Sequence, residues 1–464
     1  MDEEKLGTEK LGKLIFTMTI STIAAQIVNL MYSVVDRMYI GHIENVGGEM
    51  LTGIGVVTPV IMIISAFSSF VGGGGAPLAS IAAGKGDHRL ADRILGNGFS
   101  LLLILSVVVP SLFLIVKRPF LYFIGASDAT YGYANEYITA YLVGTVMVMI
   151  TVGLTPFIIA QGNSRTAMLS VIIGAVANIA LDPLFIFVFN MGVRGAAVAT
   201  VISQTLSAVW VLYYLVSDKA QMRIRKEFMI PDIKIILKIA SLGVSTFVMS
   251  ITESLISIVM NNGLKRYGGD VYVGCLTVMK SVMQFVSVPL TGYTQGVTPV
   301  ISYNYGAGER GRVKGAFYIS LAVLFIYTFS LALLSILFPG MFARMFTSSA
   351  DIIALTERSL PIFMAGMLVF GIQRACQTTF VALGQAKISL FIALLRKVIL
   401  LVPLALIFPI FWGADGIFYA EPVSDTIAAL TCGMIFLFTF NKILSRSGPA
   451  KASDTNAGEI NDEK

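Results

Sequence analysis

Acidic and amide side chains stand inside long apolar stretches at two places in the first half of the chain. Asp36 lies near the end of the apolar stretch 14–40, and Asn178 and Asp182 lie four residues apart in the stretch 168–189. An ionisable group inside an apolar span costs roughly 2.5–3.5 kcal/mol, so each one needs a physical reason. Because residues four apart share one face of a helix, the Asn178 amide and the Asp182 carboxylate point to the same side.

Further oxygen atoms surround these groups. Pro183 cannot donate a hydrogen bond to the carbonyl group of Ile179, which leaves that oxygen free. Carboxylate, amide, hydroxyl and carbonyl oxygens suit a hard cation, and two carboxylates held close together favour a proton on one of them. We therefore predict a site for Na⁺ or H⁺; the alternative is structural, with Asp36 paired to Arg37 and Asp182 capping a kink. The residues that share a face with Asp36 are Gln26, Asn29, Tyr32 and Ser33, and the stretch 196–216 adds Thr200, Ser203, Gln204 and Ser207.

The second half carries a different set of polar side chains in its apolar stretches. Arg396 and the acids Glu421 and Asp425 predict a buried structural salt bridge, whereas Lys397 is expected to extend its charge toward the membrane surface. For Glu253 and Lys280 two interpretations are open, contact with a substrate or a structural ion pair. The residues that we predict to contact the substrate are Glu253, Lys280, Gln284, Gln373 and Arg374.

The elements that position these side chains are membrane-spanning helices. Hydrophobic residues make up 56% of the 464 and charged residues 13%, with a mean hydropathy of +0.81, which excludes an ordinary soluble protein. Nearly all the apolar stretches reach the ~20 residues that a helix needs to cross a bilayer, and they are too long and too uniformly apolar for the strands of a barrel. We predict an all-α membrane protein with twelve spans, at about 14–40, 51–83, 97–116, 134–160, 168–189, 196–216, 235–260, 271–301, 315–338, 359–382, 388–411 and 416–440.

These spans form a duplicated unit of six. Gly84-Lys-Gly-Asp87 returns as Gly306-Ala-Gly-Glu309 at a shift of 222 residues, and near the end of each half a shift of 221 carries Gly192 to Gly413 and Ser203 to Ser424. Membrane transporters are often built from two such repeats with the substrate path between them. We predict an N-lobe over 1–227, including a cytoplasmic linker from about 217, a C-lobe over 228–445, and a disordered tail over 446–464.

The acidic pair belongs to the first half alone. At the same shift Asp36 corresponds to Ile258, and Val402 precedes Pro403 where the first half has Asp182 before Pro183.

The distribution of charge predicts the orientation. Alternate connections, beginning with the N-terminus, hold twenty Lys and Arg residues, against seven on the other side. The positive-inside rule therefore predicts a multi-pass protein of the plasma (inner) membrane with both termini in the cytoplasm. This bias and the lipid headgroups account for the net charge of +6, so no nucleic-acid partner is expected.

Catalytic motifs are missing from the sequence. The only histidines, His42 and His88, lie in connections, and no Gly-x-x-x-x-Gly-Lys-Ser/Thr loop is present. We therefore expect neither an enzyme nor a bound cofactor, and we expect a monomer that contacts membrane lipids and a small-molecule substrate.

The chain resembles the multidrug and toxic compound extrusion (MATE) family of cation-coupled antiporters over about residues 10–440. The most specific stretch is Asn178-Ile-Ala-Leu-Asp182-Pro183-Leu-Phe-Ile-Phe, followed by Gly192-Val-Arg-Gly195-Ala-Ala-Val-Ala-Thr200, and Val-Asp36-Arg-Met-Tyr-Ile-Gly41 supports it. The resemblance implies two six-helix lobes around a central cleft that opens alternately to each side. It also implies that Tyr32, Asp36, Asn178, Asp182 and Thr200 bind the coupling ion, with Asp36, Asn178, Asp182 and Thr200 as ligands if that ion is Na⁺.

Within the family, the chain is most similar to bacterial multidrug exporters with an acidic residue in the seventh helix, here Glu253. It departs from other members in two ways. It has no proline between Leu14 and Ile40, where some members bend the first helix, and it has Gln373 and Arg374 where some carry an acid in the tenth. The second departure argues against a coupling site in the C-lobe.

Two functions follow from these observations. The first is an antiporter that exports amphipathic, cationic or aromatic small molecules in exchange for H⁺ or Na⁺ by alternating access, with the 217–234 linker permitting the lobes to move. The alternative is a flippase for lipid-linked sugars, for which Lys280, Arg374 and Arg396 would hold a pyrophosphate.

Overall fold

The structure, a computed structural model, describes residues 2–41, 47–124 and 126–445, and every regular element in these residues is a helix. The predicted tail over 446–464 and His42 lie outside them. The first half contains α1 (Asp2–Thr8), α2 (Leu11–Gly41), α3 (Gly47–Gly84), α4 (His88–Phe123), α5 (Asp128–Ala160), α6 (Ser164–Pro183), η1 (Leu184–Val188) and α7 (Gly192–Val216). The second half contains η2 (Lys226–Phe228), α8 (Ile233–Gly306), α9 (Arg310–Leu337), α10 (Pro339–Phe346), α11 (Ala350–Met364), α12 (Met367–Ala382), α13 (Ala386–Leu394), η3 (Leu395–Leu401) and α14 (Val402–Leu444).

These helices make the twelve predicted spans. Ten runs of the described chain are long and apolar enough to cross a membrane, and α11 with α12 forms one more, bent by 43°. The last of the ten, 386–444, breaks at Gly413, where φ is 58°, and so counts as two spans. The fold is therefore an all-α membrane protein of twelve spans, as the sequence predicts.

Glycines with a left-handed backbone mark the repeat in the structure. Gly86 and Gly308 have φ of 81° and 80°, and Gly192 and Gly413 have φ of 54° and 58°. Residues with a side chain rarely adopt this region, whereas glycine enters it readily. The two halves of the chain thus turn at equivalent positions.

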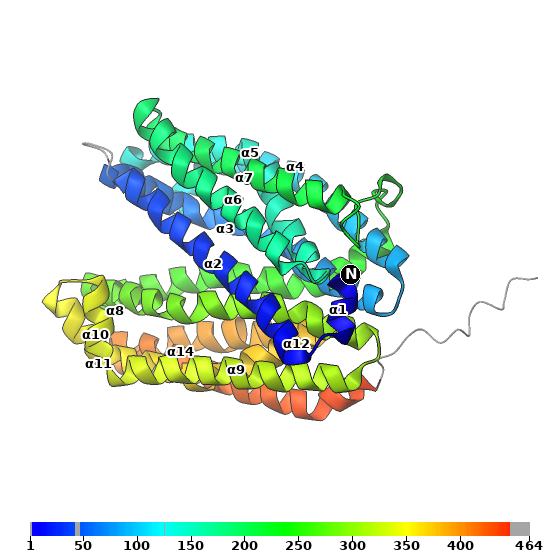
Figure 1. Ribbon diagram of the computed structural model, residues 1–464. Helices are drawn as coiled ribbons and strands as arrows, with labels where there is room; N and C mark the ends of the chain where they lie inside the picture. The colour runs from blue at the N-terminus through cyan, green and yellow to red at the C-terminus, as the bar shows by residue number, and fades with distance from the viewer. Residues whose placement is uncertain (1, 42–46, 125, 446–464) are drawn as a thin grey trace, which may run out of the picture.

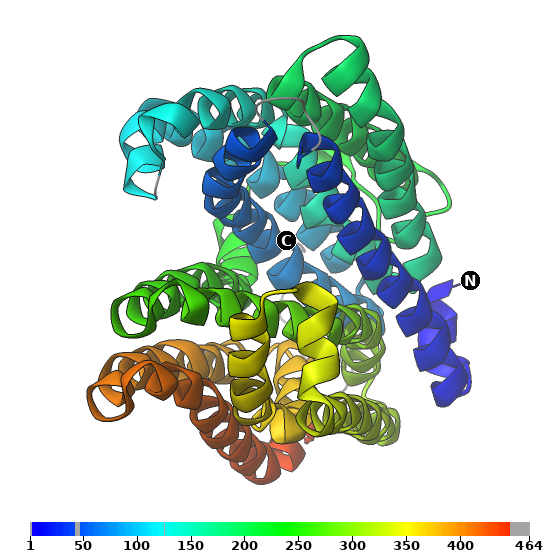
Figure 2. The same cartoon turned by 90° about the vertical axis from the view of Figure 1, so that its left-hand side faces the viewer.

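The two halves form two lobes, an N-lobe from α2 to α7 and a C-lobe from α8 to α14 (Figure 1). We call the side that carries residues 217–232 and the turns at 85–87 and 307–309 the linker face. The lobes diverge toward the opposite face, which Figure 2 views end-on.

At the linker face the lobes pack backbone against backbone. A Cβ atom added to Gly84 would lie 2.0 Å from the carbonyl oxygen of Tyr303, and one added to Gly306 would lie 2.1 Å from that of Ile81. Ile81 and Tyr303 are themselves related by the shift of 222 residues. The two contacts are therefore equivalent in the repeat, and only glycine permits them.

The first long helix of each half packs against the other lobe. Thr22 Oγ1 of α2 donates to the carbonyl oxygen of Gly292 in α8 at 2.6 Å, and farther along α2 the rings of Tyr39 and Phe187 lie 6.4 Å apart. Thr246 Oγ1 of α8 donates to the carbonyl oxygen of Ser69 in α3 at 3.2 Å. Figures 1 and 2 show α2 running from the C-lobe to the N-lobe.

Helix α1 also contacts the C-lobe. The carbonyl oxygen of Leu6, a fully buried residue, accepts hydrogen bonds from Asn304 Nδ2 at 2.9 Å and from an Arg312 amino group at 3.0 Å. The first residues of the chain thus belong to the N-lobe by sequence but pack on the C-lobe.

The connection between the halves is attached to the N-lobe along its length. Gln161 Oε1 accepts from the backbone N–H groups of Gln221 and Met222, at 2.8 and 3.1 Å. The buried Asp92 carboxylate binds Arg225 at 2.9 Å. The N–H of Asp232 donates to Asn97 Oδ1 at 2.6 Å, just before α8 begins. Contacts with the N-lobe therefore continue along the connection as far as Asp232, past the predicted boundary at 227.

Candidate functional site

The N-lobe polar residues converge below the surface, where α6 meets α7. Asn178 is 2% exposed and Asp182 is fully buried. Asn178 Nδ2 donates to Asp182 Oδ1 at 3.1 Å and approaches Thr200 Oγ1 at 3.4 Å. Pro183 ends α6, and the chain continues as the π-helical turn η1, because proline cannot supply the N–H that the α-helix requires. The predicted grouping of Asn178, Asp182 and Thr200 is thus present.

Asp36 reaches the same place from α2, and its carboxyl group interacts with that of Asp182. A carboxylate accepts but cannot donate, so the close approach of two carboxyl groups favours a proton on one of them. Within the described residues, Asp182 Oδ2 and Asn178 Oδ1 have no hydrogen-bond partner. The alternative partner of Asp36, the Arg37 side chain, lies outside the described part of the structure.

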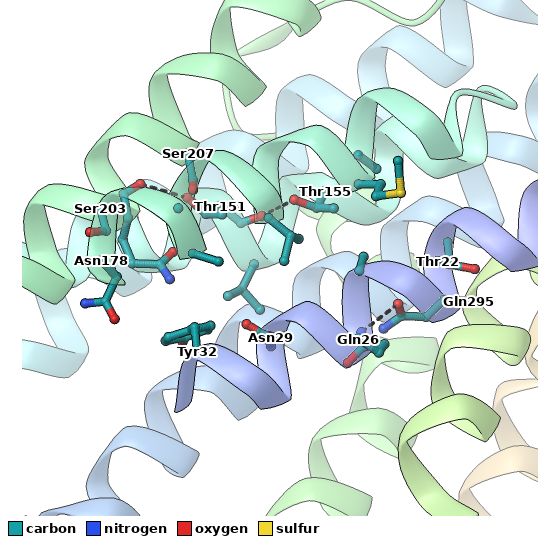
Figure 3. Close-up of a pocket in the computed structure, with 18 of the residues that line it drawn as sticks. Thr22, Gln26, Asn29, Tyr32, Thr151, Thr155, Asn178, Ser203, Ser207 and Gln295 are labelled. Atoms are coloured by element: carbon teal, nitrogen blue, oxygen red, sulfur yellow. Dashed lines mark hydrogen bonds between the residues drawn. The ribbon is translucent and has the colours of Figure 1, made fainter. Parts of the chain in front are cut away.

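A cavity of about 160 Å³ is lined by Asn178, the hydrogen-bond partner of Asp182 (Figure 3). None of the described residues that line it is charged. Gln26 Nε2 of α2 donates to Gln295 Oε1 of α8 at 3.0 Å, and this hydrogen bond joins the two lobes at the cavity rim. Polar side chains in the lining include Gln26, Asn29, Tyr32, Thr151, Thr155, Asn178, Thr200, Ser203, Gln204, Ser207 and Gln295. The cavity is therefore lined by uncharged side chains, polar and apolar, and lies next to the buried Asp182 and its acidic neighbour Asp36.

Two tyrosines that the sequence analysis missed complete this site. Tyr137 and Tyr141 of α5 are each 4% exposed, and their rings stack with centroids 6.2 Å apart. The side chain of Tyr137 lies next to Thr200. The signal in the sequence is their spacing of four residues, which puts two hydroxyl groups on one face of an apolar helix.

A larger cavity, of about 600 Å³, lies against the C-lobe. It is lined by all five residues that the sequence analysis assigned to the substrate, and Thr58, Pro59 and Met62 of α3 close it from the N-lobe. Its volume is in the range of 300–1,000 Å³ that is usual for drug-sized ligands. The predicted residues in the lining are Glu253, Lys280, Gln284, Gln373 and Arg374, and the apolar ones include Met249, Met260, Met283, Met367, Phe363 and Phe370.

Two cations in this wall have acidic partners. Arg396 Nε lies 2.5 Å from Asp425 Oδ1, and one of its amino groups lies 3.8 Å from Glu421 Oε1. This confirms the predicted salt bridge. Lys397 Nζ lies 3.7 Å from the same Glu421 oxygen, so the expectation that Lys397 extends toward the membrane surface is wrong. The buried acids of α14 hold this side chain inside the lobe.

Three other charges in the wall have no such partner. Among the described residues, Glu253, Lys280 and Arg374 form no salt bridge. Of the two interpretations open for Glu253 and Lys280, the structural ion pair is therefore not formed. Lys280 Nζ donates instead to Ser257 Oγ at 2.7 Å. An Arg374 amino group lies 3.4 Å from Thr294 Oγ1, and its buried Nε has no acceptor within the described chain.

Two tandem lobes of six spans, each with a cavity facing buried polar groups, define a membrane transporter. The MatE family model matches residues 21–184 and 246–407, once in each half and over more than half of the chain. The chain belongs to this family, as the resemblance in the sequence indicates.

Curated relatives and solved structures cover almost the whole chain. The multidrug export protein MepA of Staphylococcus aureus is 24% identical over 415 residues, which are 88% of this chain and 90% of the relative. MepA of Staphylococcus haemolyticus is 22% identical over 430 residues, 92% of each. A crystal structure of MATE in the bent conformation matches with a TM-score of 0.89 at 21% identity, over 96% of this chain and 98% of that one. The outward-facing conformation of a multidrug resistance MATE family transporter of the MOP superfamily matches with a TM-score of 0.87 at 22% identity, over 95% and 98%. These structures share the fold.

Proposed function

We propose that this protein exports amphipathic small molecules, cationic or aromatic, in exchange for protons. The relatives named as multidrug export proteins support export of this substrate class. The observation that carries the exchange is the contact of Asp36 with the buried Asp182 beside a cavity lined by uncharged side chains.

The acid pair favours H⁺ over Na⁺ as the coupling ion. Two carboxyl groups held close together favour a proton on one of them, because loss of that proton leaves two like charges that repel each other. Na⁺ remains the alternative, with Asp36, Asn178, Asp182 and Thr200 as ligands. In both cases the ion changes the spacing of α2 and α6, which carry the two acids.

Transport then links the two cavities by alternating access. By the positive-inside rule the linker face is cytoplasmic, as are both termini. The lobes meet at that face through Gly84 and Gly306, so a substrate in the C-lobe cavity would leave toward the opposite face. Because coupling between two binding events is reciprocal, proton uptake by the N-lobe must weaken substrate binding as much as substrate weakens proton binding.

One observation keeps a lipid flippase as a second candidate. Lys280 and Arg374 both line the C-lobe cavity and have no acidic partner within the described chain, and such cations suit a pyrophosphate. The monomeric state and the contacts with lipid stay predictions.

Proteoliposomes with separately imposed gradients test the proposed exchange. The probe is a permanently charged aromatic cation such as ethidium, because pH alone does not redistribute it across a bilayer. Vesicles with an acidic interior should accumulate the probe, a protonophore should abolish the accumulation, and a Na⁺ gradient alone should have no effect. Accumulation driven only by Na⁺ would assign the site to Na⁺, and no accumulation under either gradient would refute the antiport.

A further inference from the structure

The cations of the C-lobe cavity fall into two chemically different pairs. Arg396 and Lys397 are held by the acids of α14, at 2.5 Å from Asp425 and 3.7 Å from Glu421. Within the described residues, the side chains of Lys280 and Arg374 form hydrogen bonds only with hydroxyl groups, those of Ser257 and Thr294, at 2.7 and 3.4 Å. Four cations thus line one cavity, and two of them form no salt bridge with any described residue.

A partly buried cation that lacks a counter-ion is costly, because neutral hydroxyl groups replace only part of its hydration. A fold that needed these charges only for packing could have paired them, as it does Arg396. The guanidinium group of Arg374 presents a fork of N–H donors that matches a carboxylate or phosphate, and its Nε has no acceptor within the described chain. The neighbouring Gln373, only 5% exposed, also lines the cavity, and its Oε1 has no hydrogen-bond partner among the described residues.

Glu253 supplies the opposite charge on the same wall. It interacts electrostatically with both Lys280 and Arg374 but lies beyond ion-pair distance from each. Once the paired groups are set aside, the wall therefore carries two cations and one acid. A ligand with only a cationic group would meet Glu253 but would leave Lys280 and Arg374 without a counter-ion.

We propose that the C-lobe cavity is a site for zwitterionic amphipathic molecules. The carboxylate, or another small anionic group, of the substrate binds Arg374, its cationic group binds near Glu253, and its aromatic body packs on the methionine and phenylalanine wall. This inference rests on the proposed function, since it narrows the substrate class of the same site.

A matched pair of dyes tests the proposal on the purified full-length protein in detergent. One dye is a cationic rhodamine ethyl ester, and the other is the zwitterionic acid produced by hydrolysing that ester, so that the two differ only at the carboxyl group. Fluorescence anisotropy gives the Kd of each. The wild type should bind the acid about tenfold more tightly, as expected for a charge-assisted hydrogen bond from arginine.

Variants locate the anion contact. Arg374→Gln should weaken binding of the acid about tenfold and should not weaken binding of the ester. Arg374→Lys should keep part of the preference for the acid because it retains the charge. Equal weakening of both dyes in Arg374→Gln would overturn the proposal. The ratio of the two Kd values is measured on the wild-type protein and does not depend on any variant. A wild type that binds the ester more tightly than the acid would by itself overturn the proposal.

A competition experiment distinguishes the two possible anionic ligands, a small zwitterion and a lipid-linked pyrophosphate. A prenyl pyrophosphate that displaces the rhodamine acid at a lower concentration than the unlabelled acid itself would assign the site to lipid-linked pyrophosphates and overturn the small-zwitterion assignment. These measurements use no gradient. Absence of proton-driven transport together with a retained preference for the acid would therefore refute only the antiport.

Discussion

The two lobes share a backbone arrangement, but the buried acids in them have different partners. In the N-lobe, Asp182 contacts another acid and an amide, and no cation lies at salt-bridge distance from it among the described residues. In the C-lobe, Asp425 holds Arg396 at 2.5 Å. The shift of 221 residues that relates Ser203 to Ser424 also relates the neutral Thr200 and Gln204 of α7 to Glu421 and Asp425 of α14.

Under the proposed antiport, this difference assigns ion coupling to the acids of the N-lobe and a stabilising role to the acids of the C-lobe. An acid that faces a fixed arginine is neutralised permanently, so its charge cannot follow the ion gradient. An acid that faces another acid changes its charge whenever a proton arrives or leaves. We infer from the proposed antiport that the two halves share one scaffold and that substitutions at a few facing positions let the N-lobe respond to an ion, while the C-lobe keeps a fixed wall for a binding cavity.

The largest effect is expected from removing the responsive acid. Asp182→Asn should reduce transport driven by a pH gradient at least 100-fold, because the amide cannot exchange a proton with Asp36. Dye binding measured in detergent should stay within a few-fold of wild type. The matched control is Asp351→Asn, which removes an exposed carboxylate at the start of α11 and should transport normally. If Asp182→Asn transported at the wild-type rate, the N-lobe acids would not couple transport to the ion, and the proposed difference between the lobes would be wrong.

Breaking the fixed pair should instead affect stability. Arg396→Met leaves Asp425 and Glu421 buried without their main cation, which should lower the free energy of unfolding by about 3 kcal/mol or more. Thermal unfolding in detergent measures the loss. The control is Arg344→Gln, which breaks an exposed ion pair with Glu357 at 3.6 Å and should cost about 0.5 kcal/mol or less. If the two variants melt alike, the C-lobe pair is not structural.

Substitution of Gly84 by alanine should disrupt the contact between the lobes at the linker face. Gly84→Ala would place a Cβ 2.0 Å from the carbonyl oxygen of Tyr303, so the lobes must separate there. Spin labels at Lys85 and Lys314, both exposed, should show a growing population of longer distances. Gly12→Ala, whose added Cβ meets nothing within 4 Å, is the control and should keep the wild-type distribution. An unchanged distribution in Gly84→Ala would mean that the face yields locally without lobe movement.

The smallest effect is expected at the cavity acid. Glu253→Gln should weaken binding of a cationic dye about threefold to tenfold and leave a neutral dye of similar shape unchanged, since one partly solvated charge is lost. Fluorescence titration in detergent measures both. Equal weakening of both dyes, together with a lower melting temperature, would show that Glu253 supports the fold and does not select charge.

The amino-acid sequence by itself determined the features that depend on local chemistry. Apolar length gave the twelve spans, the glycine motifs gave the two-lobe repeat, and helical spacing placed Asn178 beside Asp182 and Lys280 beside Gln284. The sequence also located the acid pair in one half, since Ile258 and Val402 stand at the equivalent positions. These features were predictable because a helix in a bilayer must satisfy its backbone internally, which leaves its geometry a property of the segment alone.

Only the tertiary structure decided which charges meet across helices. Lys397 turns inward to Glu421, Glu253 and Lys280 stay apart, and Tyr137 reaches Thr200 from a helix more than fifty residues away in the chain. Ion pairing changes over a few ångströms, and that distance depends on how whole helices cross and rotate against one another. Helical periodicity specifies the face of each residue but not the neighbour it meets, so these contacts follow from the packing of the two lobes.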